Sequence, residues 1–279
     1  MSEYLFLYLI SLVAIIFAVV QDLRTREIAN WLTFSLISFV LAYRVIYSIS
    51  SKDFMFFIYG LFGVLLFIGL GYLFYYSRVF AGGDAKLLFG LGGIFPYSSL
   101  MDYIYYGFGF IILLFTSGVI YTLIYSSFLI KKNYPNFRKS FLEQINKKKY
   151  FFIFSFLLGI VVYLSKSAYD STNIILFFTI FIFLSPLLFA YVRAIEKSCM
   201  VQLVSPQKLT EGDWLEREVS VKGKTISKKF SGLTFEEIVL LRKFGKKVLI
   251  KNGVPFAPAF LFAFLAFFLF LRYSPWKPF

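Results

Sequence analysis

Long apolar runs constrain this chain more than any other feature of its sequence. The first covers residues 4–21 and contains no charged side chain. A run of about 20 apolar residues can cross the hydrocarbon core of a bilayer, and its backbone must then be helical because no water is available there. We therefore predict an all-α polytopic membrane protein with about eight transmembrane helices, at residues 4–21, 29–49, 54–76, 83–100, 103–130, 150–165, 173–192 and 255–272.

The fourth run is the least typical, because residues 87–96 are a short, glycine-rich stretch. Read alone, this segment could instead be re-entrant. The charge distribution favours a crossing, since basic residues gather on the cytosolic side of membrane proteins. With eight spans and the N-terminus outside, Arg24 and Arg78 lie on the same side as the strongly basic loop 131–149. Without the fourth crossing, that loop would lie on the opposite side from them.

The formal net charge of +14 also indicates a membrane protein rather than a nucleic-acid binder. The basic residues flank the apolar runs and do not form a stripe with interleaved stacking aromatics. Such charge favours contact with an anionic cytoplasmic leaflet. We predict a multi-pass protein of the cell (plasma) membrane that contacts lipids and binds no nucleic acid. Arg44 lies inside the second span, and we expect its side chain to snorkel toward the interface.

A polar module, residues 193–254, separates the seventh predicted span from the last one. Thr234 and Glu237 have the spacing of a capping box, which predicts that a short helix follows Thr234. Weak alternation over residues 214–221, before a turn signal at 222–223, predicts a hairpin. The module is therefore expected to be a small cytosolic α+β insert before the last transmembrane helix.

The composition excludes several kinds of active site. The chain has no histidine, which excludes a Ser-His-Asp triad, a Cys-His dyad and a His-Glu-x-x-His zinc site. Cys199 is the single cysteine, so neither an intrachain disulfide nor a cysteine zinc cluster can form. Too few acids share one membrane level for an all-carboxylate metal site. We expect neither a metal nor a cofactor.

Asp22 and Asp84 are the two acids that stand out. Each lies at the end of an apolar run, and the predicted topology puts both at the cytosolic edge of the membrane, where they can meet. Ionisable residues at membrane depth are costly and indicate function. The alternative to a catalytic role is that each aspartate is a helix cap or a solvated residue. For the glycine pair Gly82-Gly83, the alternative is close packing between helices.

Two neighbouring carboxylates do not both ionise easily. One can take a proton from water while the other, protonated, donates to a peptide carbonyl. This arrangement predicts peptide hydrolysis with Asp22 and Asp84 as the catalytic pair. Gly82 and Gly83 would let an extended substrate backbone approach, because glycine has no Cβ. Lys86 and Arg26 are candidates for orienting the carboxylates, with lipid head-group contact as the alternative favoured for Arg26.

The flanking residues resemble a known family. Asp22-Leu-Arg-Thr-Arg-Glu-Ile-Ala-Asn30 before an apolar run, and Gly82-Gly-Asp-Ala-Lys86, look like the two motifs of the type IV prepilin peptidases, the Gly-x-Gly-Asp class of aspartyl membrane proteases that includes the archaeal preflagellin peptidases. Residues 252–260 also resemble the start of the family's last helix. Two positions depart from the pattern: Ala81 replaces the first glycine, and Ala29 replaces a frequent proline. Both departures affect loop geometry and leave the carboxylates in place.

This resemblance implies an aspartic endopeptidase that removes the short basic leader of a prepilin-like or preflagellin precursor at the cytosolic membrane edge. The single cysteine and the start directly at the first span resemble the cleavage-only archaeal type. On this basis we divide the chain into a catalytic membrane core at 1–130, a basic cytosolic loop with the sixth and seventh spans at 131–192, the insert at 193–254, and the last helix with a short tail at 255–279.

Two other functions use similar residues. Presenilin-like or signal-peptide-peptidase-like intramembrane proteases also have a Gly-x-Gly-Asp motif, but their other aspartate lies in a Tyr-Asp pair within a late span. A proton- or cation-coupled transporter could use the same acids, although transporters tend to place them near the bilayer midplane.

Overall fold

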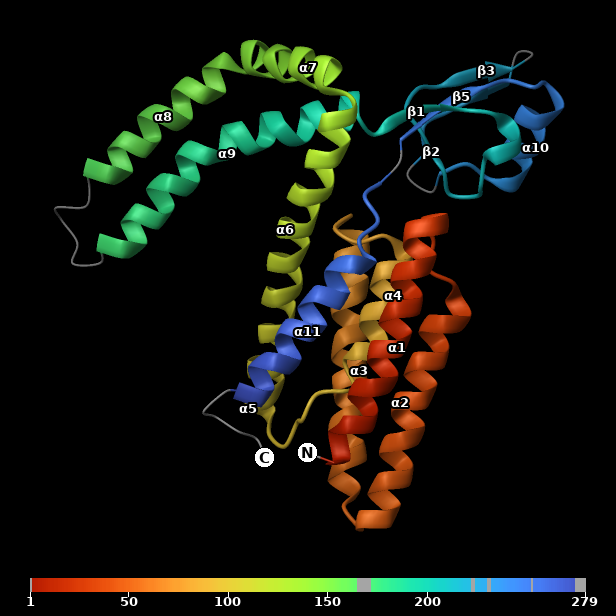
Figure 1. The fold of residues 1–279 in the computed structure, drawn as a ribbon, viewed down its shortest axis with the longest axis vertical. Helices are drawn as coiled ribbons and strands as arrows, with labels where there is room; N and C mark the ends of the chain where they lie inside the picture. The colour runs from red at the N-terminus through yellow and green to blue at the C-terminus, as the bar shows by residue number, and fades with distance from the viewer. Residues whose placement is uncertain (1, 165–171, 222–223, 230–231, 252, 274–279) are drawn as a thin grey trace. The chain divides into compact units, whose positions relative to one another are not determined.

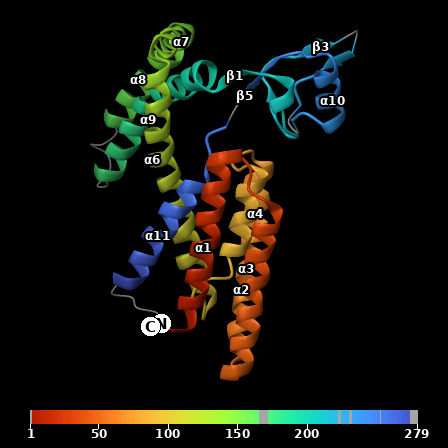
Figure 2. The ribbon, with the colours of Figure 1, turned by 45° about the vertical axis from the view of Figure 1, so that its right-hand side comes forward.

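The computed structural model describes residues 2–164, 172–221, 224–229, 232–251 and 253–273. The chain is mostly helical and divides into two compact units (Figures 1 and 2). Unit one comprises residues 1–124 and 254–279, and unit two comprises residues 125–253. The division falls inside α6, so this helix contributes to both units.

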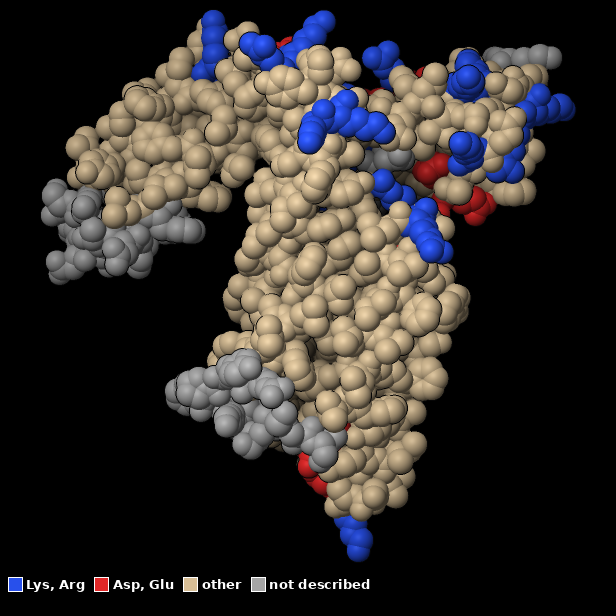
Figure 3. Space-filling model, viewed as in Figure 1, with Lys and Arg blue, Asp and Glu red and all other residues tan. Residues whose placement is uncertain are grey.

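Unit one is a bundle of helices joined by short connections. Its elements are α1 (Ser2–Thr25), α2 (Asn30–Ser51), α3 (Phe54–Tyr76), α4 (Gly82–Leu91), α5 (Leu100–Asp102), a π-helical segment (Tyr103–Phe108), the first part of α6 (Gly109–Lys132) and α11 (Ala257–Tyr273). The face of this bundle that Figure 3 shows is almost free of charge between its two ends. Side chains of the bundle such as Leu9, Phe39 and Leu65 are more than half exposed, as lipid-facing residues are.

The multi-pass membrane character predicted from the sequence is confirmed. Among the described residues, five helices are long and apolar enough to cross a bilayer: Glu3–Thr25, Asn30–Ser51, Phe54–Tyr76, Leu100–Lys132 and Thr179–Ser198. Two shorter apolar helices, Lys149–Leu164 and Ala257–Leu271, correspond to the sixth and eighth predicted spans. The count of eight crossings is not confirmed by these lengths.

The fourth predicted span, 83–100, is not one continuous helix. The helix α4 has ten residues, which is about 15 Å and half the thickness of a hydrocarbon core. Residues 92–99 continue without regular structure. Gly92 and Gly93 leave no room for a Cβ against α3 and α2, and Pro96 lacks a backbone donor, so close packing replaces helical pairing here.

The fourth run nevertheless returns the chain along the length of α3. Gly82, at its start, lies near Tyr75 at the end of α3. Tyr103, just after the run, donates a hydrogen bond of 2.8 Å to the backbone oxygen of Tyr59, near the beginning of α3. The half-helix and the irregular segment together therefore connect opposite ends of the bundle (Figure 1).

Arg44 holds the irregular segment in place. Its side chain is completely buried and donates to three backbone oxygens, those of Gly93 (2.6 Å), Phe56 (2.7 Å) and Phe95 (2.7 Å). Gly60 makes room for it, because a Cβ there would lie 1.9 Å from Arg44 Cδ. The prediction that Arg44 snorkels is wrong, since irregular backbone at membrane depth needs a donor and Arg44 supplies it.

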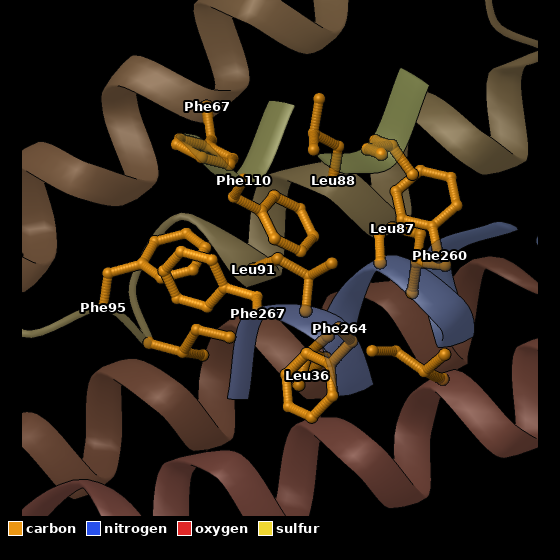
Figure 4. Packing of buried hydrophobic residues seen from close by; sticks show 14 of the residues in the cluster. Leu36, Phe67, Leu87, Leu88, Leu91, Phe95, Phe110, Phe260, Phe264 and Phe267 are labelled. Carbon is orange, nitrogen blue, oxygen red and sulfur yellow. The ribbon is translucent and has the colours of Figure 1, made fainter. Parts of the chain in front are cut away.

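The middle of unit one is packed around α4. Leu87, Leu88 and Leu91 are completely buried, and Figure 4 shows them among phenylalanines that include Phe110 and Phe260. Helices inside a membrane associate through close packing, because lipid tails are as apolar as leucine. This packing fixes the position of α4, and therefore of Asp84 near its beginning.

Unit two combines a helical part with a small sheet module. Its helices are the end of α6, α7 (Tyr134–Lys147), α8 (Lys149–Leu164), α9 (Thr172–Ser198), a 3-10 turn (Pro206–Lys208) and α10 (Phe235–Lys243), and its strands are β1 (Val201–Val204), β2 (Trp214–Leu215), β3 (Val219–Val221), β4 (Lys224–Ile226) and β5 (Val248–Lys251). The helices α7 and α8 both pack on α9. The strands form an antiparallel sheet of order β1-β5-β2 and a separate β3-β4 hairpin.

The α+β insert predicted before the last helix is confirmed. Thr234 and Glu237 form the complete capping box at the start of α10, and the β3-β4 hairpin follows the predicted alternation. The turn at 222–223 lies outside the described residues. The hydrophobic core of the module includes Ile238 and Leu241 on one side of α10 and Ile250 on β5.

Candidate active site

The structure brings Asp22 and Asp84 together. Asp22 lies in the last turn of α1 and Asp84 is the third residue of α4. Both side chains are buried, with 7% of each exposed, and the two carboxyl groups are close enough to interact electrostatically. Two acids that are 62 positions apart in the sequence, 84 minus 22, therefore share one end of the bundle.

Asp84 takes its position from the first turn of α4. Ala81 is the N-cap residue of this helix, and its backbone lies close enough to the Asp84 carboxyl group to stabilise the charged form. An acid at the third helical position faces the backbone of the cap residue. The carboxyl group thus lies beside the N-terminus of its own helix.

Asp22 takes its position from a distant part of the chain. Its Oδ2 accepts a hydrogen bond of 2.8 Å from the backbone N–H of Ala257, the first residue of α11. The backbone of Phe256 lies close to the same carboxyl group. The Ala257 donor was not predicted from the sequence, since a backbone N–H has no residue-type signature. The signal available was Pro255 and Pro258, because proline is frequent at helix starts.

The loop between α1 and α2 forms a second wall of the site. The side-chain oxygen of Gln21 accepts a hydrogen bond of 3.0 Å from the Ala29 N–H, which closes the loop. A Cβ built on Gly83 would lie 3.0 Å from the Cβ of Ile28 in this loop. Glycine at 83 therefore allows α4 to approach the loop closely, whereas Gly82 has only a 3.7 Å contact with Tyr75 and leaves space beside it.

Lys86 and Arg26 lie beside the two aspartates in different ways. Lys86 Nζ donates a hydrogen bond of 2.7 Å to Oδ1 of Asn30, which ties α4 to the first residue of α2. Arg26 is exposed, has a left-handed backbone with φ of 62°, and interacts electrostatically with Asp22. Lys86 thus contacts the scaffold of the site, and Arg26 contributes positive charge on the side of Asp22.

Within the described parts of the chain, no group of three or more acidic, cysteine or histidine side chains could hold a metal ion. Metal-free chemistry remains a prediction. The arrangement supplies two buried carboxyl groups that interact electrostatically, with a backbone donor on Asp22, at the end of a membrane bundle.

Comparison with known proteins connects this site to a family. The model of the type IV leader peptidase family matches residues 8–130, which include both aspartates. The predicted resemblance is confirmed. The preflagellin peptidase of Methanococcus voltae is 31% identical over 140 residues, which are 46% of this chain and 58% of that protein. The preflagellin peptidase of Methanococcus maripaludis is 35% identical over 89 residues, which are 32% of this chain and 38% of that protein.

The preflagellin peptidase of Methanocaldococcus jannaschii is 30% identical over a similar stretch of 89 residues. The chain covers less than two thirds of the length of each of these relatives. No solved structure matches the chain significantly. The family match at residues 8–130 covers most of the helices of unit one, including the two that carry the aspartates.

Proposed function

We propose that this protein is a membrane aspartyl endopeptidase that removes the short basic leader from type IV prepilin-like or preflagellin (archaellin) precursors. The observation that carries the proposal is the meeting of Asp22 and Asp84, both buried, at one end of the bundle. The match to the type IV leader peptidase family over residues 8–130 supports it. The intramembrane-protease and transporter alternatives gain no support from this match.

The proposed reaction needs only the two carboxyl groups and a water molecule. The ionised carboxylate takes a proton from the water, whose oxygen attacks the scissile carbonyl carbon, and the protonated carboxyl group gives its proton to the carbonyl oxygen. When the resulting diol collapses, the C–N bond breaks. The first group then returns its proton to the leaving nitrogen, and the second recovers one from the diol. Both aspartates end as they began.

The substrate would meet this site at the membrane edge. We propose eight crossings, with α4 and residues 92–99 together as the fourth, so that the site faces the cytosol in the cell membrane. The exposed basic residues Arg24 and Arg78 lie close in sequence to the two ends that carry the aspartates. The space beside Gly82 would admit an extended peptide next to Asp84. Lys86 would act through Asn30, by holding α4 against α2.

The four-part division of the chain also stays a proposal, with residues 1–130 as the catalytic core and the sheet module as a separate insert. The acidic pair lies entirely within unit one, where α11 completes it. A preflagellin-like precursor is the substrate partner that the names of the relatives suggest.

The test is processing of a co-expressed preflagellin-like precursor by single variants. Asp22→Asn and Asp84→Asn should each reduce the cleavage rate by at least about a thousandfold, because loss of a catalytic group removes several kcal/mol of transition-state stabilisation. Glu27→Gln is the matched control, since Glu27 is an exposed acid in the neighbouring loop. If either aspartate variant is present in the membrane at the wild-type amount and cleaves the precursor at the wild-type rate, the proposal is refuted.

A further inference from the structure

The two aspartates have unequal surroundings. Asp22 accepts a hydrogen bond of 2.8 Å from the backbone N–H of Ala257, the first residue of the 17-residue helix α11, and the Phe256 backbone lies nearby. Asp84 lies beside the backbone of Ala81. Backbone N–H groups at a helix N-terminus carry partial positive charge and stabilise an anion. Each hydrogen bond to a carboxylate favours its charged form over its neutral form.

The charged groups around the pair add to the same difference. Arg26, in the loop after α1, interacts with Asp22. The first turns of α11 contain no charged side chain, and Lys86 on α4 is bonded to Asn30. Asp84 is a further charged neighbour of Asp22, and it disfavours a second negative charge nearby. Because Asp84 also lies at a helix N-terminus, that of α4, the difference between the two acids rests on the Ala257 hydrogen bond and on Arg26.

From this asymmetry we propose that the N-terminus of α11 is a positioning element that places the negative charge of the pair on Asp22. The inference rests on the proposed function. Asp22 is then the base that removes a proton from water, and Asp84 is the acid that protonates the scissile carbonyl oxygen. After the C–N bond breaks, Asp22 returns its proton to the leaving amine and Asp84 regains one from the diol. The backbone donors of α11 remain in place throughout.

A single substitution removes the main donor without changing any charge. Ala257→Pro deletes the N–H that bonds to Asp22, and proline is well tolerated at the first position of a helix. Loss of one charge-assisted hydrogen bond should move the acidic limb of the pH–rate profile upward by about one to two pH units. The limb moves upward because Asp22 without this donor keeps its proton to higher pH. The ionised base is therefore available only at higher pH than in the wild type.

Two controls accompany this variant. Ala257→Gly retains the N–H, so its acidic limb should stay where the wild-type limb lies. Val254→Pro introduces a proline into the same linker at a residue outside the site, and should likewise leave the limb in place. A purely structural role for α11 would lower the rate of Ala257→Pro at every pH without moving the limb. That result, or a limb identical to that of Ala257→Gly, would overturn the inference.

A second measurement does not depend on the folding of the proline variant. In wild-type protein labelled with 15N-alanine, the Ala257 amide resonance should shift across the pH range of the acidic limb. In Asp22→Asn protein that shift should be absent. An Ala257 resonance that does not respond to pH in the wild type would also overturn the inference. The proposed function fails separately, if Asp22→Asn or Asp84→Asn still cleaves the precursor.

Discussion

Replacing Arg44 by methionine should destabilise the bundle strongly, because methionine fills much of the same space and donates no hydrogen bond. The backbone oxygens of Phe56, Gly93 and Phe95 would each lose the guanidinium donor. An unsatisfied buried polar group costs about 1–3 kcal/mol. The Phe95 oxygen keeps the Tyr97 N–H as a donor at 3.0 Å, and Phe56 lies inside helix α3, where each carbonyl accepts from the N–H four residues on. The cost therefore falls mainly on the Gly93 oxygen, and the middle of that range gives a loss of about 2 kcal/mol in the free energy of unfolding. Removing a buried cation offsets part of any larger sum.

Thermal unfolding in detergent micelles would measure this loss. A change of 1 kcal/mol shifts the melting temperature by about 2–4 °C in a domain of roughly 150–250 residues, so Arg44→Met should melt about 4–8 °C below wild type. Lys52→Met is the matched control, because Lys52 lies exposed at the end of the same helix. If Arg44→Met melts within about 2 °C of wild type, the Gly93 oxygen finds another donor and the reasoning about Arg44 is wrong.

Three further perturbations test the local contacts described above. Gly83→Val should lower the cleavage rate at least tenfold, because its side chain would push α4 away from Ile28 and separate the aspartates; Gly82→Ala, where the nearest contact is 3.7 Å, should have a smaller effect. Lys86→Met and Asn30→Ala should be non-additive by about 0.5–3 kcal/mol in a double-mutant cycle on the transition-state free energy, and full additivity would show that they act separately. Thr234→Ala should destabilise α10 by about 1 kcal/mol through loss of its cap, visible as about fivefold faster amide exchange in that helix, and unchanged exchange would contradict this.

Regular helices and caps were predictable from the sequence because their signals are local. The apolar run 54–76 coincides with α3, and the spacing of Thr234 and Glu237 marks the beginning of α10. The fourth run was harder, since its apolar composition does not distinguish a continuous helix from a half-helix followed by packed glycines. The position of Arg44 inside a span was visible, but two of its three acceptors, Gly93 and Phe95, lie on irregular backbone that the sequence did not predict.

The candidate site was predictable to a similar extent. Charge counting placed Asp22 and Asp84 on one side of the membrane, and the structure places them near each other. The donor from Ala257 could not be predicted, because any non-proline residue carries the same N–H and the partners are 235 positions apart. Candidate catalytic side chains can be recognised in a sequence by their residue type. A backbone hydrogen-bond donor can be recognised only when the fold is known.

The bond between Asp22 and Ala257 also has a consequence for the timing of activity during synthesis. Both aspartates leave the ribosome early, but the donor for Asp22 follows only after 235 more positions. A nascent chain that has inserted α1 to α6 would contain the acidic pair without its α11 partner. Asp22 would gain its Ala257 donor only when α11 joins the bundle, so the proposed peptidase activity would be low in a chain whose synthesis is incomplete.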